Sequence, residues 1–224
     1  GQAAFQGERV GGLDAGRDDG VGQRFERIEA DGLEHGRDLG IIGADVAGTG
    51  HYQGYAGGLV GLNNGIVERS FVTGSVTSTY AGATGGLLGR NAGSVSGSWA
   101  SASVTTQDGY GSATGVLVGG NAGAIADSYA SGSASGYYAG GLVGSHQGAG
   151  AGISRSYALS TVQASYPSGA GGLVGSAGGG ATIADSFWNT DIVATGVGQG
   201  GVAGTSGLPT LRWLTQGPSA AGLW

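Results

Sequence analysis

The apolar residues of this chain occur in two short phrases that recur about every 29 residues. The first phrase is GGLVG or a close variant, and its copies begin at Gly57, Gly85, Gly115, Gly140 and Gly171. The second phrase has a β-branched aliphatic residue, then a serine three positions later, then an aromatic residue directly after the serine. Neither phrase has the helical i, i+3, i+4, i+7 spacing, whereas short β-branched and aromatic stretches between Gly, Ser and Asn are typical of strands. The pattern therefore predicts strands of about four residues joined by glycine-rich turns.

Equivalent positions in the five copies keep the same type of side chain, so we expect each set to form a column of the hydrophobic core. The leucine column consists of Leu59, Leu87, Leu117, Leu142 and Leu173. The β-branched column consists of Val67, Val95, Ile125, Ile153 and Ile183. The aromatic column consists of Phe71, Trp99, Tyr129, Tyr157 and Phe187. A fourth column, five residues beyond the aromatic one, consists of Val76, Val104, Ala134, Val162 and Ile192.

One repeat is too short to bury a core by itself, but stacked repeats bury every column and pair their backbones in parallel ladders. We therefore expect an all-β fold, a right-handed parallel β-helix (β-solenoid) of about six short coils with two or three strands per coil. Adjacent coils would lie about 4.8 Å apart. Residues 41–46 match the end of the second phrase, with Ile41 in the aromatic column, and they would supply a partial coil.

The turns carry polar residues at a fixed place. Asn63, Asn91 and Asn121 follow the first phrase at the same distance. Because asparagine tolerates the left-handed region and bonds its own backbone, we expect an asparagine ladder along one corner. His146 and Ala177 take this place in the later coils, where inserted glycine and alanine residues predict looser corners.

Composition narrows the function classes. Glycine supplies 54 of the 224 residues, which disfavours helices, since each glycine inside a helix costs about 1 kcal/mol relative to alanine. The net charge is −6 and no basic stripe is present, so we expect no nucleic-acid partner. No apolar run reaches the roughly 20 residues of a membrane span. The chain lacks cysteine, which excludes disulfides and thiolate metal sites.

The repeated phrases resemble a known family. GGLVG, followed by an Asn-Gly turn and a Ser-aromatic-Ala strand, is similar to the GLUG repeat of filamentous-haemagglutinin-like adhesins and of some surface-bound bacterial IgA proteases. The segments SFWNTDIV and SGLPTLRWLTQGP (206–218) are similar to the region after the last repeat in haemagglutinin-like exoproteins. The resemblance implies export to the bacterial surface or medium, association with the outer membrane, a β-helical shaft and attachment to other surfaces.

The resemblance divides the chain into three parts. Residues 39–205 carry the solenoid repeats, and residues 206–224 form a tail without repeats. Residues 1–38 hold 14 of the 24 charged residues (9 basic plus 15 acidic) and lack the GLVG phrase. We expect this segment to be a polar cap, a linker or a stretch outside the natural reading frame.

Charged residues stand directly before the serines of the second phrase. Asp127, Arg155 and Asp185 would form an alternating surface ladder, in which exposed pairs contribute about 0–1 kcal/mol each. Asp127 and Asp185 would lie about 9–10 Å apart, near the upper limit for a pair of glycosidase carboxylates. Arg155 between them would keep both ionised and remove the acid that such an enzyme needs.

No cofactor or metal site is expected. None of His35, His51 and His146 has metal-ligand spacing, and a lone histidine in a turn is expected to be solvated. Tyrosines in the joints before the GGLVG phrases offer an apolar face and a polar tip, as contact surfaces do. They are Tyr52, Tyr55, Tyr80, Tyr110, Tyr137, Tyr138 and Tyr166.

These observations favour a non-enzymatic structural and adhesive segment of a secreted or surface-exposed bacterial adhesin. Its partners would be neighbouring repeats of a longer chain and receptors or glycans on host-cell or bacterial surfaces. One alternative is the non-catalytic stalk of a surface-bound IgA-type protease, and a second is a carbohydrate-active β-helix enzyme.

Overall fold

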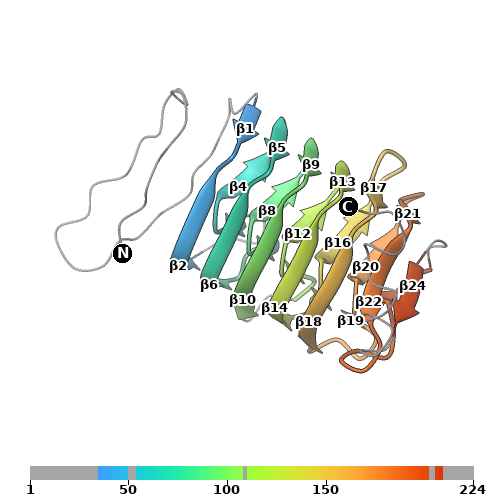
Figure 1. Cartoon of the computed structure of the whole chain (residues 1–224). Helices are drawn as coiled ribbons and strands as arrows, with labels where there is room; N and C mark the ends of the chain where they lie inside the picture. Colours follow the sequence, from blue (N-terminus) through green and yellow to red (C-terminus); the bar gives the residue numbers. More distant parts are fainter. Residues whose placement is uncertain (1–34, 50–53, 108–109, 202–204, 209–224) are drawn as a thin grey trace.

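The computed structural model describes residues 35–49, 54–107, 110–201 and 205–208. These ranges form 24 strands and no helix. The strands β3 to β6 make one complete coil, and the pattern repeats in β7–β10, β11–β14, β15–β18 and β19–β22, so that about five coils stack (Figure 1). The predicted all-β solenoid with parallel ladders is confirmed. Each coil has four strands and not the two or three predicted.

Four parallel sheets run along the solenoid, each receiving one strand per coil. Sheet A contains the β-branched column in three-residue strands. Its members are β1 His35–Arg37, β5 Ile66–Glu68, β9 Ser94–Ser96, β13 Ala124–Ala126, β17 Gly152–Ser154 and β21 Thr182–Ala184.

Sheet B has the longest strands, which lie side by side in Figure 1 and start at the aromatic column. Its members are β2 Gly40–Thr49, β6 Phe71–Thr79, β10 Trp99–Gln107, β14 Tyr129–Gly136, β18 Tyr157–Ala164, β22 Ser186–Asn189 and β24 Thr205–Leu208.

Sheets C and D come from the GGLVG phrase, which bends between them. Sheet C contains β3 Tyr55–Gly57, β7 Ala83–Gly85, β11 Ala113–Gly115, β15 Tyr138–Gly140 and β19 Ala170–Gly171. Sheet D contains β4 Val60–Asn63, β8 Leu88–Asn91, β12 Val118–Asn121, β16 Val143–Gln147, β20 Val174–Gly178 and β23 Val197–Gln199.

The bend between sheets C and D explains the first glycine of the phrase. A Cβ added at Gly85 would lie 2.0 Å from the carbonyl oxygen of Leu88, and one added at Gly115 would lie 2.1 Å from that of Val118. No side chain fits so close to the backbone, so the turn requires glycine. The bend separates a strand of sheet C from a strand of sheet D, and each coil therefore has four strands.

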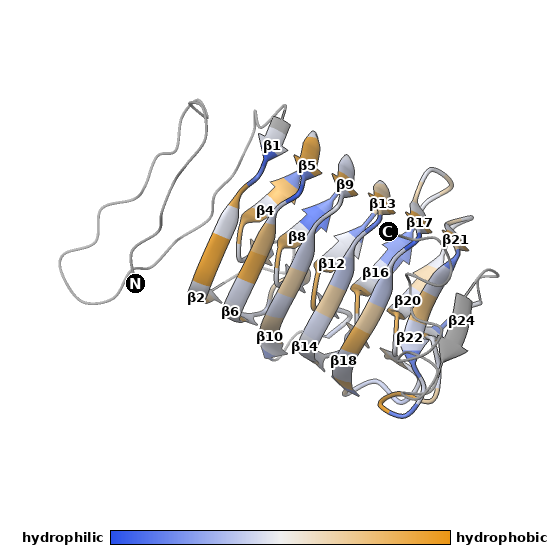
Figure 2. Cartoon of the chain, in the orientation of Figure 1, coloured by the Kyte–Doolittle hydropathy of each residue, from blue (hydrophilic) through white to orange (hydrophobic). Residues whose placement is uncertain are grey.

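The leucine and β-branched columns lie in the core. Leu59 is 8 % exposed and the other leucines are fully buried, while the β-branched residues are at most 4 % exposed. Strand register places equivalent residues of successive coils opposite each other, as in the pairs Val67–Val95 and Ile125–Ile153. Figure 2 shows apolar bands within the strands and hydrophilic colour at the corner that joins sheets A and B.

The aromatic column is not part of the core, contrary to our expectation. Successive side chains of a strand point to opposite faces, and the residues after the aromatic ones are the ones that point inward. Val72 and Ala100 are fully buried, whereas Phe71 and Trp99 are only half-buried. The aromatic rings therefore lie on the outer face of sheet B.

The first strand of sheet B departs from the predicted alignment. Gly40, and not Ile41, pairs with Phe71, and a bulge between Ile41 and Ala44 restores the register. The bulge adds one residue, so counting back from the valine column misplaces Ile41 by one position. Gly40 leaves room for the ring of Phe71, which an added Cβ would meet at 2.4 Å.

The solenoid repeats begin and end with atypical coils. β1 pairs with β5, so the ladder already includes residues 35–37, which belong to the polar segment predicted over residues 1–38. At the other end Trp188 packs against the core in the column that Ala158 occupies one coil earlier. Its Nε1 donates to the carbonyl oxygen of Val193 at 3.0 Å, and the indole fills the interior beside Gly172 and Gly196.

Candidate functional site

The serine of the second phrase forms a buried ladder that the sequence did not predict. From Ser98 onward, each serine Oγ accepts a hydrogen bond from the backbone N–H of the serine one coil earlier, as from Ser70 to Ser98 at 3.1 Å, and the Oγ of Ser70 accepts from the N–H of Leu39. Each Oγ also donates to the carbonyl two residues before it, as from Ser98 to Ser96 at 2.9 Å. The five serines are at most 1 % exposed. This ladder fixes the corner between sheets A and B.

The charged residues before the serines lie on the outside of that corner. Asp127, Arg155 and Asp185 have φ angles of 50°, 45° and 46°, in the left-handed region. Arg155 forms a two-pronged ion pair with Asp127, with both nitrogen–oxygen distances at 2.6 Å. The hydrogen bonds from Arg155 lower the pKa of Asp127, so this carboxyl stays ionised. A general acid would need a pKa shift in the opposite direction.

Asp38 and Arg69 repeat this arrangement near the start of the solenoid. Arg69 Nε lies 2.7 Å from Asp38 Oδ1, and Asp38 also has a left-handed φ of 56°. Gly97 takes the same place in the coil between the two pairs, with a φ of 56°. The repeat pattern did not point to Asp38, because residues 1–38 carry neither phrase. Asp38 lies two residues before Gly40, the first residue of β2, as Arg69 lies two residues before Phe71, the first residue of β6. This shared spacing was the available signal.

The aromatic ladder is stacked face to face along the solenoid axis. The ring centroids of Phe71 and Trp99 are 4.7 Å apart with planes 5° from parallel, and those of Trp99 and Tyr129 are 5.7 Å apart at 6°. Tyr129 and Tyr157 follow at 5.1 Å and 5°. Burial raises the pKa of Tyr157 to about 12. Each ring within the stack covers the faces of its neighbours, so the aromatic ladder presents ring edges to the solvent. Ring edges do not offer a stacking platform to a sugar.

The asparagine ladder is present and continues into His146. Asn63 donates to Asn91 and Asn91 donates to Asn121, both at 2.8 Å, and Asn121 Nδ2 lies 3.1 Å from His146 Nδ1. The prediction that His146 is solvated is wrong, since its side chain is fully buried. Its alignment with the asparagines was a signal for this burial. Burial lowers the pKa of His146, and its Nε2 lies 2.9 Å from the carbonyl oxygen of Thr182.

Four of the joint tyrosines gather where sheet B turns into sheet C. The ring of Tyr137 contacts those of Tyr110, Tyr138 and Tyr166 at centroid distances of 4.8, 4.8 and 5.0 Å. We call these four residues the tyrosine cluster. The hydrogen bond between Tyr137 and Tyr110 is the main cause that raises the pKa of Tyr137 to about 12.

The other joint tyrosines stand apart from the cluster. Tyr80 is 48 % exposed, and Tyr55 lies under the guanidinium of Arg90 at 5.6 Å. Tyr52 and His51 lie outside the described residues.

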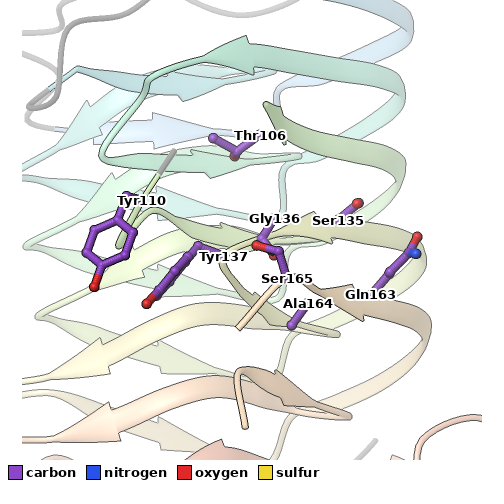
Figure 3. A pocket seen from close by; sticks show the side chains of 8 residues that line it. All are labelled: Thr106, Tyr110, Ser135, Gly136, Tyr137, Gln163, Ala164 and Ser165. Atoms are coloured by element: carbon purple, nitrogen blue, oxygen red, sulfur yellow. Dashed lines mark hydrogen bonds between the residues drawn. The ribbon is translucent and has the colours of Figure 1, made fainter. Parts of the chain in front are cut away.

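A surface hollow of about 470 Å³ adjoins the tyrosine cluster. Figure 3 shows Tyr110 and Tyr137 side by side at one end and Gln163 at the other. The lining residues are Thr106, Tyr110, Ser135, Gly136, Tyr137, Gln163, Ala164 and Ser165. None of these eight residues carries a charge, so the hollow suits a neutral, partly polar ligand.

Neither a metal-binding cluster nor a membrane-spanning helix occurs in the described residues. Residues 35–49, 54–107, 110–201 and 205–208 contain no group of three or more His, Cys, Asp or Glu able to hold a metal ion. The same ranges offer no helix with the length and hydropathy that a membrane span requires.

Comparison with known proteins identifies one motif. The family model of the GLUG motif matches residues 52–77, which include the first complete coil from β3 to most of β6. This match confirms the GLUG repeat in the chain. No curated protein and no solved structure matches the chain.

Proposed function

We propose that this chain is a structural and adhesive segment of a secreted or surface-exposed bacterial protein of the filamentous-haemagglutinin-like class. The solenoid would act as a stiff shaft, and the tyrosine cluster would act as a contact surface for receptors or glycans. The GLUG motif at residues 52–77 supports this class because such repeats occur in these adhesins.

The observation that carries the proposal is the stacking of about five coils in register. Successive coils contact each other through the same serine and aromatic positions, so the body extends in one direction and holds surface groups at fixed spacing. A shaft that displays a contact surface needs this geometry, and the exposed tyrosines lie on its outer corner.

The adhesive role can be tested with surfaces coated with the purified chain. Cultured epithelial cells and bacterial cells should attach to the wild-type coating, and attachment should fall to background on a Tyr110→Ser/Tyr137→Ser double variant. Tyr80→Ser is the matched control because Tyr80 is exposed at a joint outside the cluster. Equal attachment to all three coatings would contradict the role of the tyrosine cluster, and no attachment to the wild type would contradict the adhesive role.

Export can be tested on intact cells that produce the parent protein. Brief protease treatment of unbroken cells, followed by mass spectrometry, should release peptides from residues 35–208. A cytoplasmic marker protein provides the control for lysis. Recovery of the peptides only after lysis would refute surface exposure.

The ion pair at Asp127 works against the alternative of a carbohydrate-active enzyme, because Arg155 keeps the carboxyl ionised. We accordingly propose that the chain has no enzymatic activity. An activity on glycans that disappears in Asp127→Asn would overturn this part of the proposal. The protease-stalk alternative shares the shaft role and predicts a zinc-binding HExxH helix further along the parent protein.

A further inference from the structure

The tyrosine cluster leaves one aromatic face free beside the hollow. Tyr137 is partly covered, because Tyr166 stacks on it at an interplanar angle of 28°, Tyr138 meets it edge-on and Tyr110 leans against it at 52°. Tyr110 is at the open end of this group and is 74 % exposed. A ligand that stacks on the cluster therefore finds the ring of Tyr110.

The rest of the hollow supplies small and polar groups at the ends of two neighbouring strands. Gly136 and Ala164 are the last residues of β14 and β18, and because they are small they leave space for a ligand in the hollow. Ser135 and Gln163 come one residue earlier on the same strands, where β-pairing holds them side by side. In the described part of the chain, neither side chain makes a hydrogen bond. Their hydroxyl and amide are free to bind a ligand.

We infer that this hollow binds a neutral saccharide of two or more units, with one pyranose ring stacked on Tyr110 and the hydroxyls of a neighbouring unit bonded to Ser135 and Gln163. The face of an aromatic ring is electron-rich, and the C–H face of a pyranose is apolar with a slight positive charge, so the two attract each other. The inference rests on the proposed function, because it assigns a ligand class to the same contact surface.

Charge favours neutral saccharides over acidic ones. The eight lining residues are uncharged, so none of them can pair with the carboxylate or sulfate group of an acidic glycan. A proline-rich peptide is less suited to the hollow, because such peptides dock between several open aromatic faces. Of the two aromatic residues that line the hollow, Tyr137 already contacts three other rings.

The test measures binding of lactose, maltotriose, chitotriose and sialyllactose to the purified chain by saturation-transfer NMR and calorimetry. At least one neutral saccharide should bind, with transfer to its C–H face. Tyr110→Ala should weaken binding about tenfold or more, whereas Tyr110→Phe, which keeps the ring, should stay within about threefold. Tyr80→Ala should have no effect, since Tyr80 does not line the hollow. Thermal unfolding of each variant checks that the fold is intact.

Several outcomes would overturn the inference. They are binding of no neutral saccharide, equal weakening by Tyr80→Ala, stronger binding of sialyllactose, and binding of a polyproline peptide in place of the sugars. Enzymatic removal of cell-surface glycans separates the inference from the proposed function. If cells still attach to the coated chain after this treatment, the adhesive role stands and the saccharide site fails. If untreated cells do not attach either, the adhesive role fails.

Discussion

The hydrogen bonds of His146 hold only for a neutral ring. Asn121 Nδ2 can only donate, so His146 Nδ1 must accept, and the proton resides on Nε2, which donates to Thr182. The ring reproduces the two roles of an asparagine in the ladder, because Asn91 likewise accepts from the preceding asparagine, Asn63, and donates to a sheet-A carbonyl of the next coil, that of Ala124. Protonation of Nδ1 would point its N–H at the Asn121 amide N–H, so two hydrogen-bond donors would face each other inside the buried corner.

This arrangement makes stability depend on pH. The pKa of His146 is lowered in the folded state, so below about pH 6.5 the unfolded chain binds a proton that the folded chain does not. The contribution of His146 to the free energy of unfolding is therefore complete above about pH 6.5 and decreases as the pH falls towards the folded-state pKa.

Thermal unfolding between about pH 7.5 and about pH 5 should show this decrease in the wild type. His146→Asn should remove most of it, because asparagine continues the ladder and does not titrate. The carboxyl of Asp127 does not contribute in this range, since its lowered pKa places its effect at more acidic pH. The prediction fails if the variant keeps the pH dependence of the wild type.

The sequence contained the information on His146, but residue type misled the interpretation. The position aligns with three asparagines, and alignment predicts shared surroundings. A histidine met alone suggests a solvated turn, since its two ring nitrogens are usually bonded to water. The tyrosine cluster could not be predicted in the same way, because the joints differ in length and sequence alone does not show which tyrosines meet.

The outward aromatic ladder ties neighbouring strands of sheet B together. Trp99 lies between Phe71 and Tyr129 and stacks on both rings, and stacked pairs contribute about 0.5–1.5 kcal/mol each beyond the area they bury. Trp99→Ala should therefore lower the free energy of unfolding by about 1–3 kcal/mol.

Chemical denaturation checks this value, and near-UV circular dichroism should show loss of the stacked aromatic signal. Trp99→Tyr keeps a ring in place and should retain most of the stability. Ser101→Ala alters another outward residue of β10 and serves as the control. A Trp99→Ala variant as stable as Ser101→Ala would show that the stacks contribute nothing measurable.

At the level of strands, the sequence predicted which residues stack on which but not which face they occupy. The serine alignment predicted the pairing of Trp99 with Tyr129 that the ladder has. The inward small residues Ala100, Ala130 and Ala158 were overlooked as a column, although alternation makes them the core partners of an outward aromatic. The bulge before Ala44 was not predictable, because no repeated residue marks it.

The whole molecule behaves as a row of coils that contact only their neighbours, so damage at one end should stay local. Trp188 fills the interior of the last complete coil beside Gly172 and Gly196. Trp188→Ala would leave this space empty and remove the hydrogen bond to Val193. We expect the last coil to open more often while the central coils keep their protection.

Hydrogen exchange resolved by mass spectrometry measures this effect. Amides of β19–β22 should exchange about tenfold faster or more in Trp188→Ala, with little change in β7–β10. Trp188→Phe should lie between the variant and the wild type, since its ring fills part of the space. Uniformly faster exchange along the chain would mean that the solenoid unfolds as one unit.

The serine ladder has a consequence for inheritance. Each serine offers an Oγ acceptor to the coil before it and a backbone N–H donor to the coil after it, as Ser98 does between Ser70 and Ser128. A recombination event that removes one whole repeat therefore brings together two surfaces that already match. Copy number can drift between lineages without a break in the serine ladder at the new junction, and the distance at which the tyrosine cluster is displayed becomes a trait that selection can adjust one coil at a time.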